Sequence, residues 1–506
     1  MKKNRFCRVL SLFSAMLAAM QFSSCGLVTV TDMRAESEDK KTEFEQNNTE
    51  NKNNDDTDKK DPPSKLVLPE IKDYLSEFDG INYKNDVLVI TSPDTEKFSP
   101  DEETPEMISE SVYLRNRRAE EAVGIKIVTR RGEINAMLDK TKSSAESGTF
   151  FTDILMIPIY KFGYYAIDSL LLDMRSVRSF DPSAEYFNSS AASAVSGGFA
   201  TLGITGNEAV SPDSYTSVLA NKDILQNAGA DISELYASAS KGSWTYDLLF
   251  EYTAAVDALS DASLSLTSEV ADSRLSDIVF TSSGCDFVFG LHTKTPRIGF
   301  TPSSSEKAIN NIKKLLSAKK TSKEKNSSKD ISASELFSSG RSAFHIQSLG
   351  MLVSLADSET EFAILPLPKS EEAGNYRTLI SNNETLFAVP KNHRAPEYAV
   401  TSLSAICAAS SGMYSEYVNY AFSNILRDAD SANMLDIILS SAVFDFAFAY
   451  GGVYPDIAAA TYKLVRSASD IEDIPAVYEE LEKKAAVCFT ENVNIKKAEF
   501  KKPKEK

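Results

Sequence analysis

Polar and aromatic residues stand directly after several segments of the chain that are predicted to be strands. They could bind a small polar molecule, because amide and carboxylate groups form directed hydrogen bonds and a tyrosine ring offers a flat face to a sugar ring. In an open α/β sheet, ligands bind beyond the carboxyl ends of the strands. The alternative for each residue is an ordinary solvated loop. The candidates are Ser92, Asp94, Tyr160, Lys161 and Gln347 at or after the ends of predicted strands, Asn382 and Asn383 before the strand predicted at 385–389, and Tyr450 as a further aromatic group.

No residue pattern points to an enzyme. The three histidines lack the spacing of metal ligands, and the chain has no nucleophile elbow, phosphate-binding loop or dinucleotide-binding fingerprint. Cys285, Cys407 and Cys488 lie far apart without a Cys-x-x-Cys spacing, which predicts buried small apolar side chains. We therefore expect no catalytic residue, no metal and no cofactor. A pair of carboxylates for glycoside hydrolysis stays open, because its spacing is spatial rather than sequential.

The N-terminal region has the features of an export signal. Four basic residues among the first eight precede an apolar run at residues 9–20, which is too short to span a bilayer comfortably. Small residues then precede Cys25 in a pattern that resembles the lipobox of bacterial lipoproteins, although leucine is usual where this chain has Phe22. The resemblance implies removal of residues 1–24 and a diacylglycerol on the Cys25 sulfur. An ordinary signal with an incidental cysteine is the alternative.

The composition changes after Cys25. Residues 25–65 are rich in charged and amide side chains and predict a disordered acidic tether, and residues 494–506 predict a frayed basic tail. No later segment reads as a transmembrane helix. The formal net charge of −18 disfavours binding to nucleic acid and flat docking on anionic lipid.

Helix and strand patterns alternate through the remaining chain. Continuous apolar strands between helices predict mostly parallel strands covered on both faces. Helices are predicted at 105–123, 133–147 and 242–257 and over nearly all of the chain from 395, and a surface loop is predicted at 318–330. Strands are predicted at 87–90, 125–128, 153–157, 199–206, 216–221, 342–347, 362–367 and 385–389.

Several of these segments resemble the extracellular solute-binding proteins of ABC importers, of the broad type that carries sugars (family 1-like). Each segment is weak evidence alone, and their order behind a lipobox is the specific feature. The similarity runs from about residue 82 to 454. The segments are 113–121 (YLRNRRAEE) with 124–127 (GIKI), 152–155 (TDIL), 220–225 (ANKDIL), 242–247 (GSWTYD), 336–344 (LFSSGRSAF), 362–368 (FAILPLP), and 427–428 with 434–436.

The resemblance implies a fold class, α/β of the periplasmic-binding-protein-like type II, with two α/β lobes joined by a hinge and a helix-rich C-terminal part. It places 66–200 and 370–430 in lobe 1, and 201–369 and 431–493 in lobe 2. In the family's motif Trp244 opens a helix and packs against the lobe, so we expect it to be structural rather than a platform for sugar.

The implied function is the capture of a small solute by cleft closure at the extracellular face of the membrane. The implied partners are a small-molecule solute (a sugar or oligosaccharide is favoured), the subunits of an ABC permease, and the membrane through the lipid anchor, and we expect a monomer. The scarcity of tryptophan leaves peptides and other solutes open. Two further hypotheses are a surface glycan-binding or adhesion lipoprotein without transport, and a surface hydrolase.

Overall fold

The computed structural model describes residues 66, 68, 70–95, 98, 109–196, 200–259, 263–291, 296–319 and 331–493. The expected signal peptide, Cys25, the tether and the basic tail lie outside these residues, as do His292 and most of the stretch at 318–330. The described residues all belong to one compact unit that begins at Pro63.

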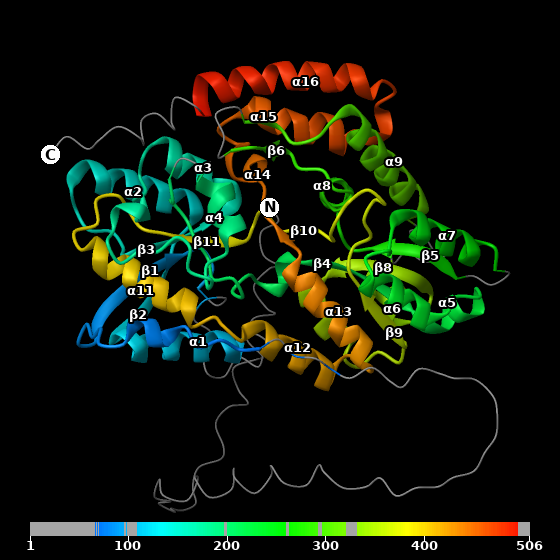
Figure 1. Cartoon of the computed structure of the whole chain (residues 1–506), viewed down its shortest axis with the longest axis horizontal. Coiled ribbons are helices and arrows are strands. Elements are labelled where there is room, and N and C mark those ends of the chain that lie inside the picture. The colour runs from blue at the N-terminus through cyan, green and yellow to red at the C-terminus, as the bar shows by residue number, and fades with distance from the viewer. Residues whose placement is uncertain are drawn as a thin grey trace, which may run out of the picture. The chain divides into compact units, whose positions relative to one another are not determined.

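The first sheet has the strand order β11-β3-β1-β2, with β1 parallel to both β2 and β3, and β11 antiparallel to β3 (Figure 1). All four strands were predicted. Leu88 and Ile90 of β1 pack with α1 and α11, whereas Leu155 and Ile157 of β3 pack with α2, α3 and α4 on the opposite face. The bounds are β1 Asp86–Ser92, α1 Ser109–Val123, β2 Ile125–Arg131, α2 Ile134–Ser147, β3 Ile154–Pro158, α3 Ile159–Ile167, α4 Ser189–Ser196, β11 Thr385–Ala388 and α11 Pro396–Ala408.

The second sheet has the order β5-β8-β4-β9, in which β5 is parallel to β8 and β4 is antiparallel to both of its neighbours. The prediction of mostly parallel strands therefore holds for the first sheet and is wrong for the second. The reason is that β4 enters from a segment connecting the two sheets rather than from a helix packed on its own sheet. The bounds are β4 Thr216–Asn221, α5 Lys222–Asn227, α6 Ile232–Ser240, α7 Tyr246–Asp257, β5 Leu264–Ser268, α8 Asp272–Ser282, β6 Val288–Phe289, β7 Arg297–Ile298, α9 Pro302–Ala318, α10 Ala333–Ser338, β8 Ser342–Ser348 and β9 Phe362–Leu365.

The strand predicted at 199–206 is wrong. Only single bridges form there, between Ile204 and Phe387 and between Gly206 and Phe187. Leu202 is fully buried, and a Cβ at Gly203 would come within 2.3 Å of the Phe162 ring. The apolar character of this segment comes from its passage between packed side chains rather than from a ladder of strand pairs.

The carboxylates of two glutamates accept hydrogen bonds that stabilise the segments connecting the two sheets. The Glu384 carboxylate accepts hydrogen bonds from Ser211 N (3.1 Å) and Ser214 Oγ (2.6 Å), so the outgoing segment at 200–215 is tied to the returning one. The Glu208 carboxylate accepts from the amides of Gly412 and Tyr414, at the start of α12 (Met413–Asn424). Burial raises the pKa of Glu208, against the opposing effect of these two amides.

The C-terminal part is nearly all helical, as predicted, and it contacts both sheet regions. α13 packs on β9, α14 packs on α3 and α4, and η5 and α16 pack on α8 and α9 (Figure 1). α14 thus lies on helices of the region expected for lobe 1, although its residues fall in the range expected for lobe 2. The predicted lobe boundaries stay a prediction. The bounds are β10 Thr378–Leu379, α13 Ala429–Ser440, β12 Ala442–Val443, α14 Phe446–Tyr450, α15 Pro455–Ala459, η5 (a π-helix) Ala460–Arg466 and α16 Ile474–Cys488.

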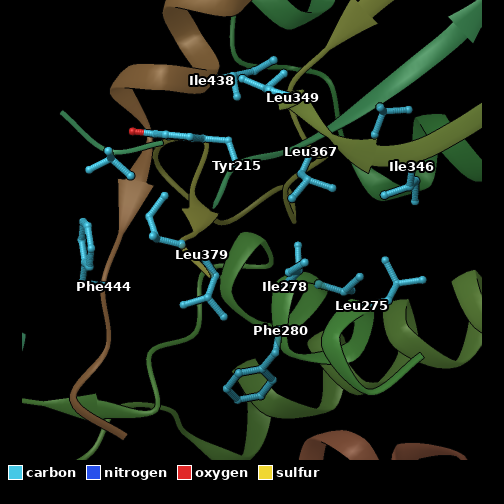
Figure 2. Packing of buried hydrophobic residues seen from close by; sticks show 14 of the residues in the cluster. Tyr215, Leu275, Ile278, Phe280, Ile346, Leu349, Leu367, Leu379, Ile438 and Phe444 are labelled. Atoms are coloured by element: carbon cyan, nitrogen blue, oxygen red, sulfur yellow. The ribbon is translucent and has the colours of Figure 1, made fainter. Parts of the chain in front are cut away.

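The apolar core runs without a break between the two sheet regions. One cluster of buried side chains extends from Ile157 and Phe162, beside the first sheet, to Ile346 in the second. Figure 2 shows its central part, where Tyr215, Ile278, Leu379 and other side chains from α8, β8, β10 and α13 gather. The connecting segments are therefore part of the core rather than solvated linkers.

Trp244 and the described cysteines have the structural roles that the sequence predicts. Trp244 is fully buried, and its Nε1 donates to the Pro366 carbonyl at 2.9 Å. Cys285, Cys407 and Cys488 are buried, and burial raises the pKa of Cys285 and Cys407 to about 12.

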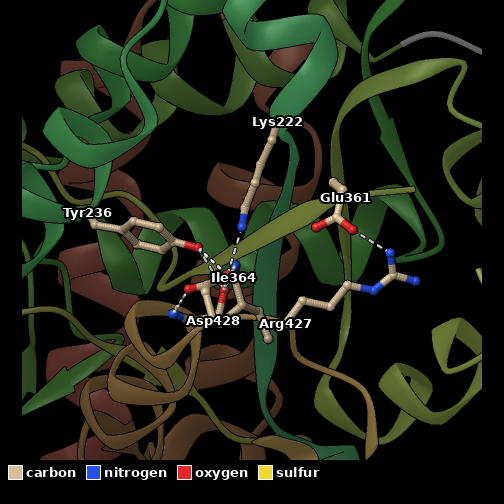
Figure 3. A network of polar contacts seen from close by, with 7 residues as sticks. Lys222, Tyr236, Glu361, Ile364, Arg427 and Asp428 are labelled. Carbon is tan, nitrogen blue, oxygen red and sulfur yellow. Dashed lines mark hydrogen bonds and ion pairs between the residues drawn. The ribbon is translucent and has the colours of Figure 1, made fainter. Parts of the chain in front are cut away.

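A polar network around Asp428 joins four elements of the second region (Figure 3). Asp428 caps α13 by accepting from Ser431 N at 2.7 Å, and it also accepts from Lys222 Nζ (2.7 Å) and from the Tyr236 hydroxyl (3.2 Å). The Ser431 hydroxyl in turn accepts from Ile364 N in β9. One carboxylate thus stabilises the contact of α5, α6 and β9 with α13.

We predict that Asp428→Ala lowers the free energy of unfolding by about 3 kcal/mol, because it removes a helix cap and leaves the partly buried Lys222 without its carboxylate. Urea unfolding measures the loss. Arg427→Ala is the control, since Arg427 and Glu361 form an ion pair in which both side chains are about two-fifths exposed, and its loss should stay below about 1 kcal/mol. Equal losses in the two variants would contradict the prediction.

Candidate functional site

A pocket of about 340 Å³ opens beside the start of α3, and we call it the α3 pocket. Its volume lies within the range of roughly 300–1,000 Å³ that is usual for small-molecule sites. Its wall combines α3 and the turn before β11 with α14, α15 and the end of η5. The lining residues are Tyr160, Lys161, Tyr164, Asn382, Asn383, Ala447, Phe448, Gly451, Gly452, Ala458 and Arg466.

Backbone hydrogen bonds position the first wall of the pocket. β3 ends at Pro158, which precedes α3. The amides of Ile159 and Tyr160, which have no partner inside the helix, donate to the carbonyls of Glu384 (2.9 Å) and Asn382 (3.1 Å). The start of α3 and the turn before β11 are therefore held together, although more than 220 residues separate them in the sequence.

Lys161 lies between two tyrosine rings on this wall. Its Nζ is 5.9 Å from the ring centre of Tyr160 and 5.1 Å from that of Tyr164, and it donates to Asn135 Oδ1 at 3.0 Å. An ammonium group has three donors, so this bond leaves capacity for a ligand. The side-chain amides of Asn382 and Asn383 have no hydrogen-bond partner among the described residues.

The second wall comes from the C-terminal helices. The Tyr164 hydroxyl donates to the Gly452 carbonyl at 3.1 Å, and a Cβ at Gly163 would come within 2.8 Å of the Ala449 carbonyl oxygen. α3 and α14 can approach this closely because Gly163 has no side chain. Phe448 and Arg466, from this C-terminal part of the chain, line the same pocket as Tyr160 and Lys161.

A buried carboxylate holds Arg466. Asp277 of α8 is fully buried, and it accepts from Arg466 Nε at 3.1 Å and from Arg466 Nη2 at 2.5 Å. Burial raises the pKa of Asp277, and Arg466 opposes this rise. Arg274, one helical turn before Asp277, donates to the Leu379 carbonyl at 2.6 Å, and burial lowers its pKa to about 10. Arg466 therefore pairs with Asp277, and Arg274 interacts electrostatically with the same carboxylate.

The structure brings together four of the eight candidate residues, namely Tyr160, Lys161, Asn382 and Asn383. Tyr160 and Lys161 follow β3, whereas Asn382 and Asn383 precede β11, so the two pairs are far apart in the sequence. Their role in binding a ligand stays a prediction.

The other four candidates lie outside the α3 pocket. Ser92 is fully buried, and its hydroxyl bonds to the backbone of Asp94 in the turn after β1. Gln347 is buried within β8, opposite Ser217 of β4. Tyr450 is also fully buried; its hydroxyl donates to the Val195 carbonyl at 2.6 Å, and its ring stacks on Phe446. Tyr450 and Gln347 are therefore packed inside the fold, and neither lies in a solvated loop. The role of these four candidates in binding a ligand stays a prediction.

Several pocket residues were not among the candidates. Tyr164 is one helical turn after Tyr160, so the spacing of the two tyrosines is a signal in the sequence. The Gly451-Gly452 pair marks a close backbone approach. No local signal identifies Arg466, because its position depends on a carboxylate 189 residues earlier.

The described histidines have packed positions. His345 is fully buried, and its Nδ1 lies 2.9 Å from Thr267 Oγ1. Burial lowers the pKa of His345 to about 4. His393 Nε2 lies 2.8 Å from Asp153 Oδ1. Within the described ranges, no group of three His, Cys, Asp or Glu side chains is arranged to hold a metal ion. The same part of the chain includes no helix with the length and apolar character needed to cross a bilayer.

The model of one protein family, described as bacterial extracellular solute-binding protein, matches residues 117–418, which is more than half of the chain. The chain belongs to this family. The resemblance seen in the sequence is therefore confirmed over a somewhat narrower range than expected. A comparison with curated protein sequences finds no match.

Solved structures of such solute-binding proteins share the fold. A cyclic α-maltosyl-1,6-maltose binding protein from Arthrobacter globiformis has a TM-score of 0.53 at 13% identity, over 80% of this chain and 99% of the other. A family 1 extracellular solute-binding protein from Bifidobacterium longum subsp. infantis has a TM-score of 0.52 at 13% identity, over 80% and 99%. A cyclo/maltodextrin-binding protein complexed with maltotetraose has a TM-score of 0.50 at 17% identity, over 81% and 98%. The α/β fold of type II binding proteins is thus confirmed.

The carboxylate that begins α14 predicts how the stability of this solute-binding protein depends on pH. Asp445 accepts from the amides of Ala447 (2.8 Å) and Phe287 (2.9 Å), and burial raises its pKa to about 6 in spite of these bonds. The folded chain therefore binds a proton more readily than the unfolded chain between about pH 4 and pH 6. The contribution of Asp445 to stability should fall by about 2–3 kcal/mol as the pH rises through this window.

Asp445→Asn should remove this contribution and flatten the curve of unfolding free energy against pH between 4 and 6. Urea unfolding at several pH values measures the slope, which is independent of any constant loss that the substitution causes. Parallel curves for the natural chain and the variant would contradict the prediction.

Proposed function

We propose that this chain is a lipid-anchored solute-binding protein that captures a small solute, with a carbohydrate favoured, in the α3 pocket and delivers it to an ABC importer. Membership of the solute-binding family supports capture and delivery. Two of the proteins with a similar fold have carbohydrate ligands, cyclic α-maltosyl-1,6-maltose in one and maltotetraose in the other, which supports the preference for a carbohydrate.

The observation that carries the proposal is the composition of the α3 pocket wall from both sheet regions. α3 continues from the first sheet, whereas Arg466 forms an ion pair with Asp277 of α8, the helix that follows β5 of the second sheet in the chain. A solute that contacts both walls would stabilise the arrangement in which they are close, and this is the requirement for closure by population shift.

The wall also has the chemistry that a carbohydrate needs. Tyr160, Tyr164 and Phe448 provide aromatic faces, and the amides of Asn382 and Asn383 provide both donors and acceptors. No covalent step is required of any of these residues.

We predict that the double variant Asn382→Ala, Asn383→Ala weakens binding of a carbohydrate ligand at least about tenfold, because each lost amide removes hydrogen bonds in a partly desolvated wall. Thermal shift against sugars, oligosaccharides, peptides and polyamines identifies the ligand class, and calorimetry then measures affinity. Asn424→Ala is the control, since Asn424 is an exposed asparagine of α12 outside the pocket. Full affinity in the double variant, or turnover of the ligand, would contradict the proposal.

The lipid anchor is tested separately. In a bacterial host that processes lipoproteins, the full chain should appear in the membrane fraction and take up labelled palmitate. Cys25→Ser should abolish both, because the Cys25 sulfur carries the diacylglycerol in the proposal. Cys7→Ser is the matched control, since Cys7 lies in the expected signal peptide. Membrane attachment and labelling that persist in Cys25→Ser would contradict the anchor.

A further inference from the structure

The charges of the α3 pocket wall differ from those of the chain as a whole. The chain has 72 acidic and 54 basic residues. The charged residues that line the pocket within the described part of the chain are Lys161 and Arg466, and no carboxylate lines it. Carboxylates close to this wall but outside its lining include Asp277, which is fully buried and pairs with Arg466, and Glu133, which interacts electrostatically with Lys161.

The buried groups behind the wall add a further positive charge. Arg466 pairs with Asp277, and the nearby Arg274 donates to a backbone carbonyl, so the three charged side chains together have one positive charge in excess. Arg274 Nη1 is buried and has no hydrogen-bond partner among the described residues. A positive charge of this kind, remote from bulk water, is less screened than a charge on the surface.

The two cations stand beside groups suited to a sugar ring. Lys161 lies over the faces of Tyr160 and Tyr164, and Asn383 and Asn382 project from the neighbouring turn. A neutral sugar presents many hydroxyl donors and would favour carboxylate acceptors, which this wall lacks. A carboxylate on the ligand would instead find an ammonium and a guanidinium, the partners that form the strongest hydrogen bonds with it.

We propose that the α3 pocket selects a carbohydrate that carries a carboxylate, such as a uronic acid or an oligosaccharide that contains one. Lys161 and Arg466 bind the carboxylate, while Tyr160 and Tyr164 pack against the ring and the two asparagines bind hydroxyl groups. This inference rests on the proposed function, since it names the ligand class of the same pocket.

The test compares digalacturonate with its uncharged dimethyl ester, which has the same two sugar rings, by calorimetry on the purified chain. Digalacturonate should bind at least about tenfold more tightly than the ester, and its advantage should shrink when the salt concentration rises from about 0.05 M to about 0.5 M. Lys161→Gln should reduce the affinity for digalacturonate about tenfold or more and change the affinity for the ester less than about threefold. Lys241→Gln, at an exposed lysine after α6, is the control and should leave both affinities unchanged.

Arg466 requires a paired substitution, because removing it alone would leave Asp277 buried without its partner. The double variant Asp277→Asn, Arg466→Gln keeps a neutral pair at this position, and its thermal unfolding curve establishes that it is folded. It should also lose affinity for digalacturonate selectively.

The two proposals fail in different ways. Equal affinities for digalacturonate and its ester, or equal losses for both in Lys161→Gln, overturn the inference and leave a carbohydrate-binding pocket in place. Binding of a peptide or polyamine by a chain that binds neither sugar overturns the proposed carbohydrate preference together with the inference.

Discussion

The amides of Ile159 and Tyr160 donate hydrogen bonds to the carbonyls of Glu384 and Asn382, and the geometry of the α3 pocket depends on this contact. The first turn of any helix has amides without internal partners, and burial makes each of them costly to leave unpaired. Here the chain returning from the second sheet satisfies them. The helix that presents Tyr160 and Lys161 is thereby joined to the turn that presents Asn382 and Asn383, so one pair of bonds fixes both halves of the first wall.

The same returning segment connects the pocket to the hinge. Glu384 supplies its carbonyl to α3 and its carboxylate to Ser211 and Ser214 in the outgoing segment. Any change in the angle between these two segments must therefore move the start of α3 or break bonds to Glu384. Because the apolar core continues through this region, such motion would be a pivot about packed segments rather than the separation of independent bodies.

The local field in the α3 pocket has the opposite sign to the net charge. At physiological salt the interaction between exposed charges is largely screened beyond about 8 Å, so the acidic surface has little influence on a ligand that is already between Lys161 and Arg466. Asp277 offsets one of the two guanidinium charges of Arg466 and Arg274, so one positive charge remains beside the pocket. The net charge of −18 thus describes how the whole protein meets polyanions, whereas the pocket is governed by the few groups that line it.

Local patterns in the sequence predict seven of the eight strands in the two four-stranded sheets, and short segments carry the resemblance to the family. Apolar runs such as that of β1, and the capping residues Asn221 and Thr245 before α5 and α7, are local signals, so they survive in a single chain without its fold. The sequence also placed Tyr160 and Lys161 after one predicted strand and Asn382 and Asn383 before another. These residues meet because β11 runs antiparallel to β3, so that β11 begins at the edge of the sheet where β3 ends. Three features cannot be read from the sequence and are known from the folded structure. Tyr450 and Gln347 are buried, β4 runs antiparallel to β8, and Arg466 lines the pocket. Each of these depends on contacts between segments far apart in the chain, whose energies leave no periodicity or spacing in the sequence.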